Sequence, residues 1–180
     1  MPTIFTHAVA ALALGKASAG AQRMPARFWL LSALCAILPD ADVLGFSLGW
    51  RGSMLGHRGL SHSLLFALAV ALAVVRLAFR KTPPFKPAWL VLYFFAVTAS
   101  HGLLDALTDG GSGVAFFAPF DDARYFFPWR PIEVSPLSLD RFFGPRGAEV
   151  IRSEVVWVWL PAAALIILAW LFRRLRGGAK

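Results

Sequence analysis

The apolar residues of this chain are gathered into long runs that short polar segments separate. Three runs, at residues 64–79, 88–107 and 155–172, carry almost no charge. Their lengths match the roughly 17 to 25 residues that a helix needs to cross a bilayer. Two further runs, at residues 4–14 and 28–38, are rich in Ala and Leu but shorter. The pattern predicts an all-α, multi-pass membrane protein with about five membrane-embedded helices.

The composition supports this interpretation. The 180 residues are 58% hydrophobic and only 16% charged, and the mean hydropathy of +0.63 is too high for an ordinary soluble domain. The chain contains no internal repeat, phosphate-binding Gly-rich loop or nucleophile elbow. We therefore expect one helical membrane domain over residues 1–180, with residues 108–154 forming a lid-like segment outside the membrane.

The placement of charge predicts the orientation of the helices. Basic residues without acidic neighbours follow the first run, surround the link after the third and follow the last; they are Lys16, Arg23, Arg27, Arg76, Arg80, Lys81, Lys86, Arg173, Arg174, Arg176 and Lys180. All ten acidic residues lie in or beside the other connections, with Arg51, Arg58, Arg124, Arg130, Arg141, Arg146 and Arg152. The positive-inside rule then places the N-terminus outside and the C-terminus in the cytoplasm. The net charge of +8 thus reflects membrane topology and does not indicate a nucleic-acid partner.

The first apolar run is expected to be retained. No Lys or Arg precedes it, whereas a secretory signal peptide begins with a basic segment.

Imidazole and carboxylate groups gather at the predicted outer ends of the helices. The candidate metal ligands are His7, Asp40, Asp42, His57, His62, His101 and Asp105. These groups bind zinc and similar divalent ions, and a metal would compensate for their burial in apolar surroundings. The sequence therefore predicts a divalent metal site at the non-cytoplasmic face.

Local spacing refines the prediction. His101 and Asp105 are four residues apart in a helix, so their side chains share one face. Pro39 is expected to end the second helix and to place Asp40 and Asp42 in an extended turn, where one binds the metal while the other orients a ligand or caps a helix. Ser61 is the expected N-cap of the third helix, with His62 in its first turn.

These motifs resemble those of the YdjM-type family, described as LexA-regulated, membrane-bound, metal-dependent hydrolases. The residues that carry the resemblance are His7, Pro39-Asp-x-Asp42, His57-Arg-Gly-x-x-His-Ser63, His101-x-x-x-Asp105 and Trp129-Arg-Pro-Ile132. The resemblance covers most of the chain. It implies a bacterial or archaeal inner-membrane protein with hydrolase activity on a substrate that the family does not define.

The ligand pattern of that family is in turn similar to those of zinc-dependent phospholipase C and P1-type nuclease. This similarity implies that His7, Asp42, His57, His62, His101 and Asp105 bind metal, and that Asp40 binds metal or orients a ligand. Those soluble enzymes have further histidine ligands downstream, whereas this chain has no histidine after His101. We therefore expect one or two ions, most simply zinc, with manganese and iron still open because ligand type alone does not decide selectivity.

The predicted chemistry is hydrolysis by a metal-activated water. Asp40 or Asp105 is the expected catalytic base. Arg124 and Arg130, in the lid-like segment, are candidates for binding a substrate phosphate, although interfacial arginines also commonly contact lipid headgroups.

Three functional classes follow from this chemistry. The leading hypothesis is cleavage of a phosphoester or phosphodiester in a membrane lipid or lipid-linked substrate. An intramembrane zinc amidase or esterase is the second, and a non-enzymatic metal-binding membrane protein is the third. Ionisable groups through the whole depth of the membrane would indicate a transporter, and the basic half of this chain has none between its helices.

Overall fold

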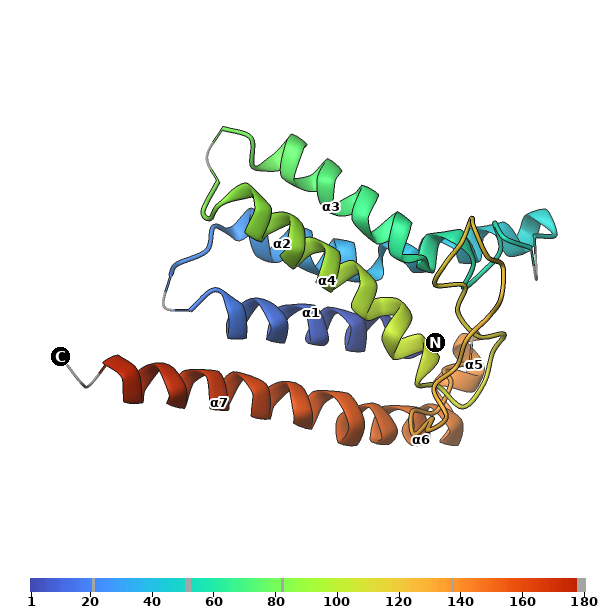
Figure 1. The fold of residues 1–180 in the computed structure, drawn as a ribbon. Helices are drawn as coiled ribbons and strands as arrows, with labels where there is room; N and C mark the ends of the chain where they lie inside the picture. Colours follow the sequence, from blue (N-terminus) through green and yellow to red (C-terminus); the bar gives the residue numbers. More distant parts are fainter. Residues whose placement is uncertain (21, 51–52, 82, 137, 178–180) are drawn as a thin grey trace.

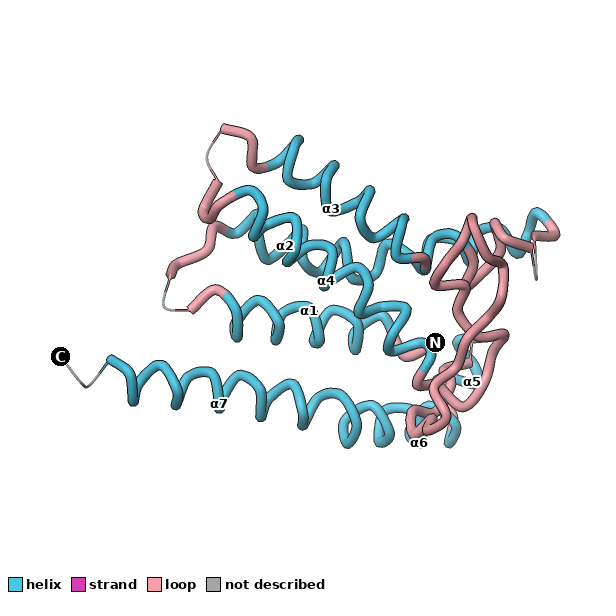
Figure 2. Tube along the Cα trace, viewed as in Figure 1, coloured by secondary structure: helices cyan, strands magenta, loops and turns pink. Residues whose placement is uncertain are grey.

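The computed structural model describes residues 1–20, 22–50, 53–81, 83–136 and 138–177. Five helices lie side by side in a bundle: α1 (Ile4–Ser18), α2 (Ala26–Ile37), α3 (Leu64–Ala78), α4 (Pro87–Ala106) and α7 (Leu160–Gly177) (Figure 1). The short helices α5 (Leu139–Phe142) and α6 (Pro145–Glu154) lie at one end of it with the long connection after α4. The described residues contain helices and loops but no strand, as the all-α prediction requires (Figure 2). Arg51 and Lys180, two residues used to predict orientation, lie outside the described residues.

Three helical stretches are long and apolar enough to cross a membrane: Ala26–Gly45, Pro87–Ala106 and Pro145–Arg176. α1 and α3 are apolar but shorter. Residues 28–38, expected to be a short run, are therefore part of a longer helical stretch, whereas residues 64–79 form a helix shorter than a full span. The N-terminal ends of α1 and α3 lie at the same end of the bundle as the long connection (Figure 1).

The core forms where α2, α3 and α4 meet α1. Phe28, Phe79 and Phe94 are fully buried there with small residues such as Ala11 and Ala71. Small side chains let helices approach closely, which is the usual basis of packing within a membrane. The hydroxyl of Tyr93 satisfies itself inside this core by donating to Ser32 Oγ at 2.8 Å.

Pro161 explains an irregularity at the start of α7. Proline has no backbone N–H and clashes with the preceding helical turn. Residues Val155–Trp159 adopt a π-helix, in which the N–H of Leu160 donates to the carbonyl of Val155. This wider turn joins α6 to α7 in one continuous helical stretch.

Two local predictions are wrong. Leu38–Leu48 is a 3-10 helix and not an extended turn, since proline is tolerated in the first turn of a helix. Ser63, not Ser61, is the N-cap of α3, and its Oγ accepts from the N–H of Phe66 at 3.1 Å. Ser61 is unavailable for this role because its hydroxyl donates to Asp42 Oδ2. His62 consequently lies in the short 3-10 turn Leu60–His62 before α3.

Candidate metal centre

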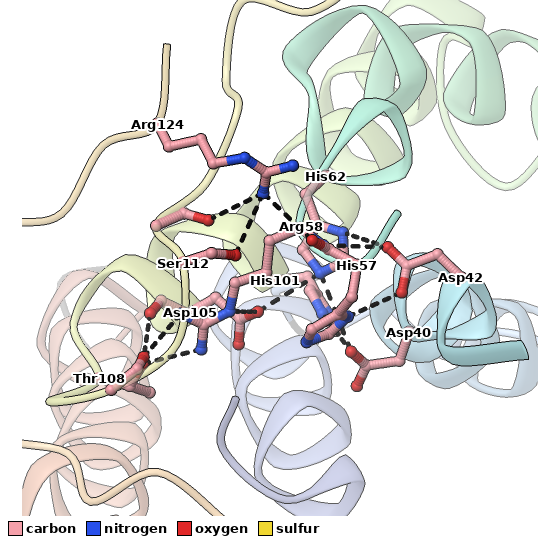
Figure 3. Close-up of polar contacts among 12 residues, drawn as sticks. Asp40, Asp42, His57, Arg58, His62, His101, Asp105, Thr108, Ser112 and Arg124 are labelled. Atoms are coloured by element: carbon pink, nitrogen blue, oxygen red, sulfur yellow. Dashed lines mark hydrogen bonds and ion pairs between the residues drawn. The ribbon is translucent and has the colours of Figure 1, made fainter. Parts of the chain in front are cut away.

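The structure brings all seven predicted ligands to one end of the bundle, where close contacts connect them. Five histidine–carboxylate pairs have a nitrogen and an oxygen between 3.1 and 3.9 Å apart. Their side chains come from α1, the 3-10 helix after α2, the 57–62 segment and α4. The residues are His7, Asp40, Asp42, His62, His101 and Asp105. His57 joins the cluster through Asp42, with Nδ1 2.8 Å from Oδ1. Figure 3 shows these side chains converging from separate helices.

Four of these residues offer ligand atoms to one common point. Ligand atoms of Asp40, His62, His101 and Asp105 all lie within 4.8 Å of one another. Nε2 of His101 is 3.2 Å from Asp40 Oδ1, and Nε2 of His62 is 3.4 Å from Asp105 Oδ2. The side chain of Asp40 is 7% exposed and that of Asp105 is fully buried.

His7 completes the deepest part of this cluster. Its Nε2 lies 3.8 Å from Asp105 Oδ1, and its ring stacks on that of His101 with centroids 3.7 Å apart. The stacked rings therefore join α1 to α4 inside the cluster.

The cluster concentrates unsatisfied polar atoms. Among the described residues, every buried side-chain nitrogen or oxygen without a hydrogen-bond partner belongs to His7, Asp40, Arg58, His62, His101 or Asp105. Leaving such groups unpaired costs about 1–3 kcal/mol each, and more for charged groups. A divalent cation would satisfy the carboxylate oxygens and imidazole nitrogens together, so the residues present fit a metal ion.

Contacts at Nδ1 orient the rings of His101 and His62, the two histidines nearest Asp40 and Asp105. Nδ1 of His101 donates to the carbonyl of Ala36 at 2.6 Å, and Nδ1 of His62 lies 3.1 Å from Asp42 Oδ2. Each contact holds the proton on Nδ1 and leaves Nε2 directed into the cluster. Metal-binding histidines in proteins typically donate their second ring nitrogen in this way.

Asp40 and Asp42 play different structural parts. Asp42 is saturated: besides the two histidines, the N–H of Arg58 donates to it at 3.2 Å and the hydroxyl of Ser61 donates to the same oxygen. Asp40 accepts no hydrogen bond at either oxygen. A 3-10 helix has three residues per turn, so side chains two residues apart point in different directions. Asp40 therefore has both oxygens available to a metal, whereas Asp42 already accepts hydrogen bonds; Asp42, His57 and His62 form a second group that could hold a metal ion.

The carboxylates also favour positive charge on His62, which lies in the connection before α3. Burial opposes the charged ring, but contacts with Asp105 and Asp42 outweigh it and raise the pKa of His62 to about 9. A metal ion that binds Nε2 of His62 would therefore have to displace the proton of this ring.

Arg58 is the functional residue that sequence reasoning missed. Its side chain is buried, its backbone has a φ of 63°, and its Nε lies 3.0 Å from Asp105 Oδ2. The guanidinium also donates to Thr108 Oγ1 at 2.8 Å and to the Gly110 carbonyl at 2.9 Å. A Cβ on Gly111 would lie 2.5 Å from this guanidinium, so only glycine fits beside it. Arg58 thereby fixes Asp105 and the chain after α4, and its presence in the His57-Arg-Gly motif was the available signal.

The structure does not direct the two predicted phosphate-binding arginines to the cluster. Arg124 donates to the carbonyls of His57 (3.1 Å) and Ser53 (3.0 Å), and burial lowers its pKa. Arg130 is exposed and stacks on the ring of Phe126, 4.7 Å from its centroid. Arg124 thus braces the 53–57 segment beside the site.

Glu154 is a second buried group that the sequence did not reveal. Its carboxylate is fully buried and accepts from the backbone N–H of Thr3 and from the hydroxyls of Thr3 and Thr6, each at 2.7 Å. A carboxylate at a helix N-terminus satisfies free N–H groups and complements the helix dipole. This contact ties the start of α1 to the C-terminal end of α6.

Comparison with known proteins places the chain in a family. The family model described as YdjM inner membrane protein matches residues 1–176. The chain belongs to the YdjM family of inner membrane proteins. It is also 41% identical to the inner membrane protein YbcI of Escherichia coli (strain K12) over 177 residues, which cover 97% of this chain and all of that protein. No solved structure matches the chain. Membership and the apolar helices together indicate a bacterial inner membrane location.

Proposed function

We propose that this protein is a membrane-bound, metal-dependent hydrolase that cleaves a phosphoester or phosphodiester in a membrane lipid or lipid-linked substrate. The observation that carries the proposal is the buried convergence of Asp40, His62, His101 and Asp105 within 4.8 Å, with their facing atoms unsatisfied. We assign one or two divalent ions, most simply zinc, to this cluster and to His7. The YdjM-type resemblance supports the same chemistry.

The residues of the chain divide the work between them. A divalent ion held there would activate water and polarise a phosphoryl oxygen. Asp42 and the Ala36 carbonyl orient the rings of His62 and His101. Nε of Arg58 lies 3.0 Å from Asp105 Oδ2, whereas neither oxygen of Asp40 accepts a hydrogen bond. Of the two predicted bases, Asp40 is therefore the better candidate.

The proposal includes a membrane orientation. We assign five embedded helices, an outer N-terminus and a cytoplasmic C-terminus, which would place the cluster at the non-cytoplasmic face. Lipids of the bilayer lie at the same level as this face, so a lipid or lipid-linked substrate could reach the cluster without leaving the membrane. No nucleic-acid partner is proposed.

A structural metal site is the second candidate, because His101 and Asp105 are fully buried, as ligands of closed sites are. Catalysis would instead require that water and substrate reach the cluster, where both carboxylate oxygens of Asp40 are also buried in this structure. The intramembrane amidase or esterase hypothesis shares the site and differs only in substrate.

Elemental analysis tests the metal assignment. We expect one or two equivalents of metal in detergent-purified wild-type protein and loss of that metal in His101→Ala, with membrane insertion retained. Ser100→Ala, at the neighbouring position on α4, is the matched control and should keep its metal. Metal-free wild-type protein after zinc supplementation would refute the assignment. Released headgroup or phosphate from lipid substrates, abolished by a chelator and restored by zinc, then separates the hydrolase from the structural candidate.

A further inference from the structure

An apolar groove runs from the lipid-facing side of the bundle to the candidate metal centre. It has a volume of about 560 Å³ and lies between α1, α2 and α3. Apolar side chains line it, including Leu31 and Leu34 of α2 and Val70 and Val74 of α3. Asp40 and Ala41 line it where the chain leaves α2. Pockets of about 300–1,000 Å³ are typical of small-molecule sites.

The end of the groove that Asp40 lines lies beside the candidate metal centre. Asp40 accepts no hydrogen bond, and its Oδ1 is 3.2 Å from Nε2 of His101. A second apolar groove, of about 320 Å³ between α1, α4 and the α7 stretch, is lined by residues such as Leu14, Leu103 and Leu165. No candidate ligand lines that second groove. Both grooves are therefore apolar, but of these two only the first is lined by a candidate metal ligand.

The groove is continuous with the surface that faces the membrane. α2 belongs to the span Ala26–Gly45, and its residues Leu34 and Leu38 are 47% and 42% exposed in the protein alone. In an inner membrane protein such side chains meet lipid chains. From Leu31 to Leu38 the groove follows α2 for about 10 Å, at 1.5 Å per residue. A hydrocarbon chain fits a path that is apolar along its length and ends beside Asp40.

We infer that the hydrocarbon chain of a membrane lipid occupies this groove, with its polar headgroup at Asp40. The lipid enters sideways from the bilayer, so its headgroup reaches the cluster while its chain stays in apolar surroundings. That this lipid is also the substrate rests on the proposed hydrolase function; the binding site itself does not.

Photocrosslinking tests the groove in the whole protein. The protein is placed in vesicles of phosphatidylethanolamine and phosphatidylglycerol that contain a trace of phosphatidylglycerol with a photoreactive group in one acyl chain. We expect crosslinks on the groove residues of α2 and α3, and loss of most of them in Leu34→Trp, which fills the groove. Leu72→Trp is the matched control: Leu72 is 51% exposed on α3 and does not line the groove. It should leave the crosslinks intact.

Three outcomes overturn the inference. The first is equal labelling in Leu34→Trp and Leu72→Trp, which would mean ordinary boundary lipid. The second is the absence of lipid crosslinks on the groove residues of the wild-type protein. The third is undiminished labelling in Val70→Trp, which fills the same groove from α3 and tests it again if Leu34→Trp does not fold.

Metal analysis of the same samples separates this inference from the proposed function. His101→Ala should lose its metal yet keep the lipid crosslinks, because His101 does not line the groove. If wild-type protein binds lipid in the groove but no metal, the hydrolase proposal fails and the binding site stands.

Discussion

Asp42 offers the sharpest test of how the centre is organised. Its carboxylate is contacted by Nδ1 of His57, the hydroxyl of Ser61, the backbone N–H of Arg58 and Nδ1 of His62. In Asp42→Asn, the single amide oxygen can still face the three donors that share Oδ2, while the amide nitrogen replaces Oδ1 opposite His57. The ring of His62 would therefore stay oriented but lose the partner charge that strengthens its metal bond.

Removing such an orienting carboxylate typically lowers metal affinity by about 10- to 100-fold, or roughly 1.4 to 2.8 kcal/mol. Because the main orienting contact survives, we expect about a tenfold loss for Asp42→Asn and a loss nearer a hundredfold for Asp42→Ala. Competition against a chromogenic chelator in detergent measures both values. Asp140→Asn, an exposed carboxylate in α5, is the control and should bind metal like the wild type.

Two results would refute this reasoning. An unchanged affinity in Asp42→Ala would show that His62 needs no support from behind. Complete loss of metal in Asp42→Asn, as severe as in His101→Ala, would make Asp42 a direct ligand, as the resemblance to zinc-dependent phospholipase C implies.

Further predictions concern the surroundings of the centre. Gly111→Ala places a Cβ against the Arg58 guanidinium and should weaken metal binding, whereas Gly20→Ala, at a similar positive φ but in open space, should not; chelator competition compares them. Glu154→Gln removes the charge that holds the start of α1, and we expect a lower thermal midpoint, equivalent to about 1–3 kcal/mol, since hydrogen bonds to charged groups contribute that much; an unchanged midpoint contradicts this role. Because the pKa of His62 is about 9 without metal, binding must displace its proton, so metal affinity should rise with pH until pH reaches that value. An affinity that is flat from neutral pH upward would show that His62 is not a ligand.

Much of the architecture follows from the order of apolar residues alone. Segments of this length without charge have no stable alternative to a helix in a membrane, because the bilayer offers no partners for the backbone. The clustering of histidines and acids at one end was also predictable. His7 lies near the start of α1, Asp40 follows the end of α2 and His101 lies toward the end of α4, and helices that alternate in direction bring these positions to the same end of the bundle.

The division of roles inside the site was not predictable. Whether Asp40 or Asp42 faces the cluster depends on the 3-10 turn after Pro39, and both side chains look alike in sequence. The burial of Arg58 depends on Asp105 and on a loop some fifty residues away, which no local periodicity records. Charge counting placed Arg58 among the arginines of the predicted outer connections, whereas its side chain is buried against Asp105.

The ligands are also widely separated in the order of synthesis. His7 leaves the ribosome first, while His101 and Asp105 appear only after two more apolar segments have been made. The cluster can therefore close only when α4 has joined α1, α2 and the 57–62 turn. An ion that binds the closed cluster and not the open chain would stabilise the finished bundle by mass action. The supply of metal would then govern how long the protein survives in the membrane. A cell that lacks the metal would lose the protein to proteolysis.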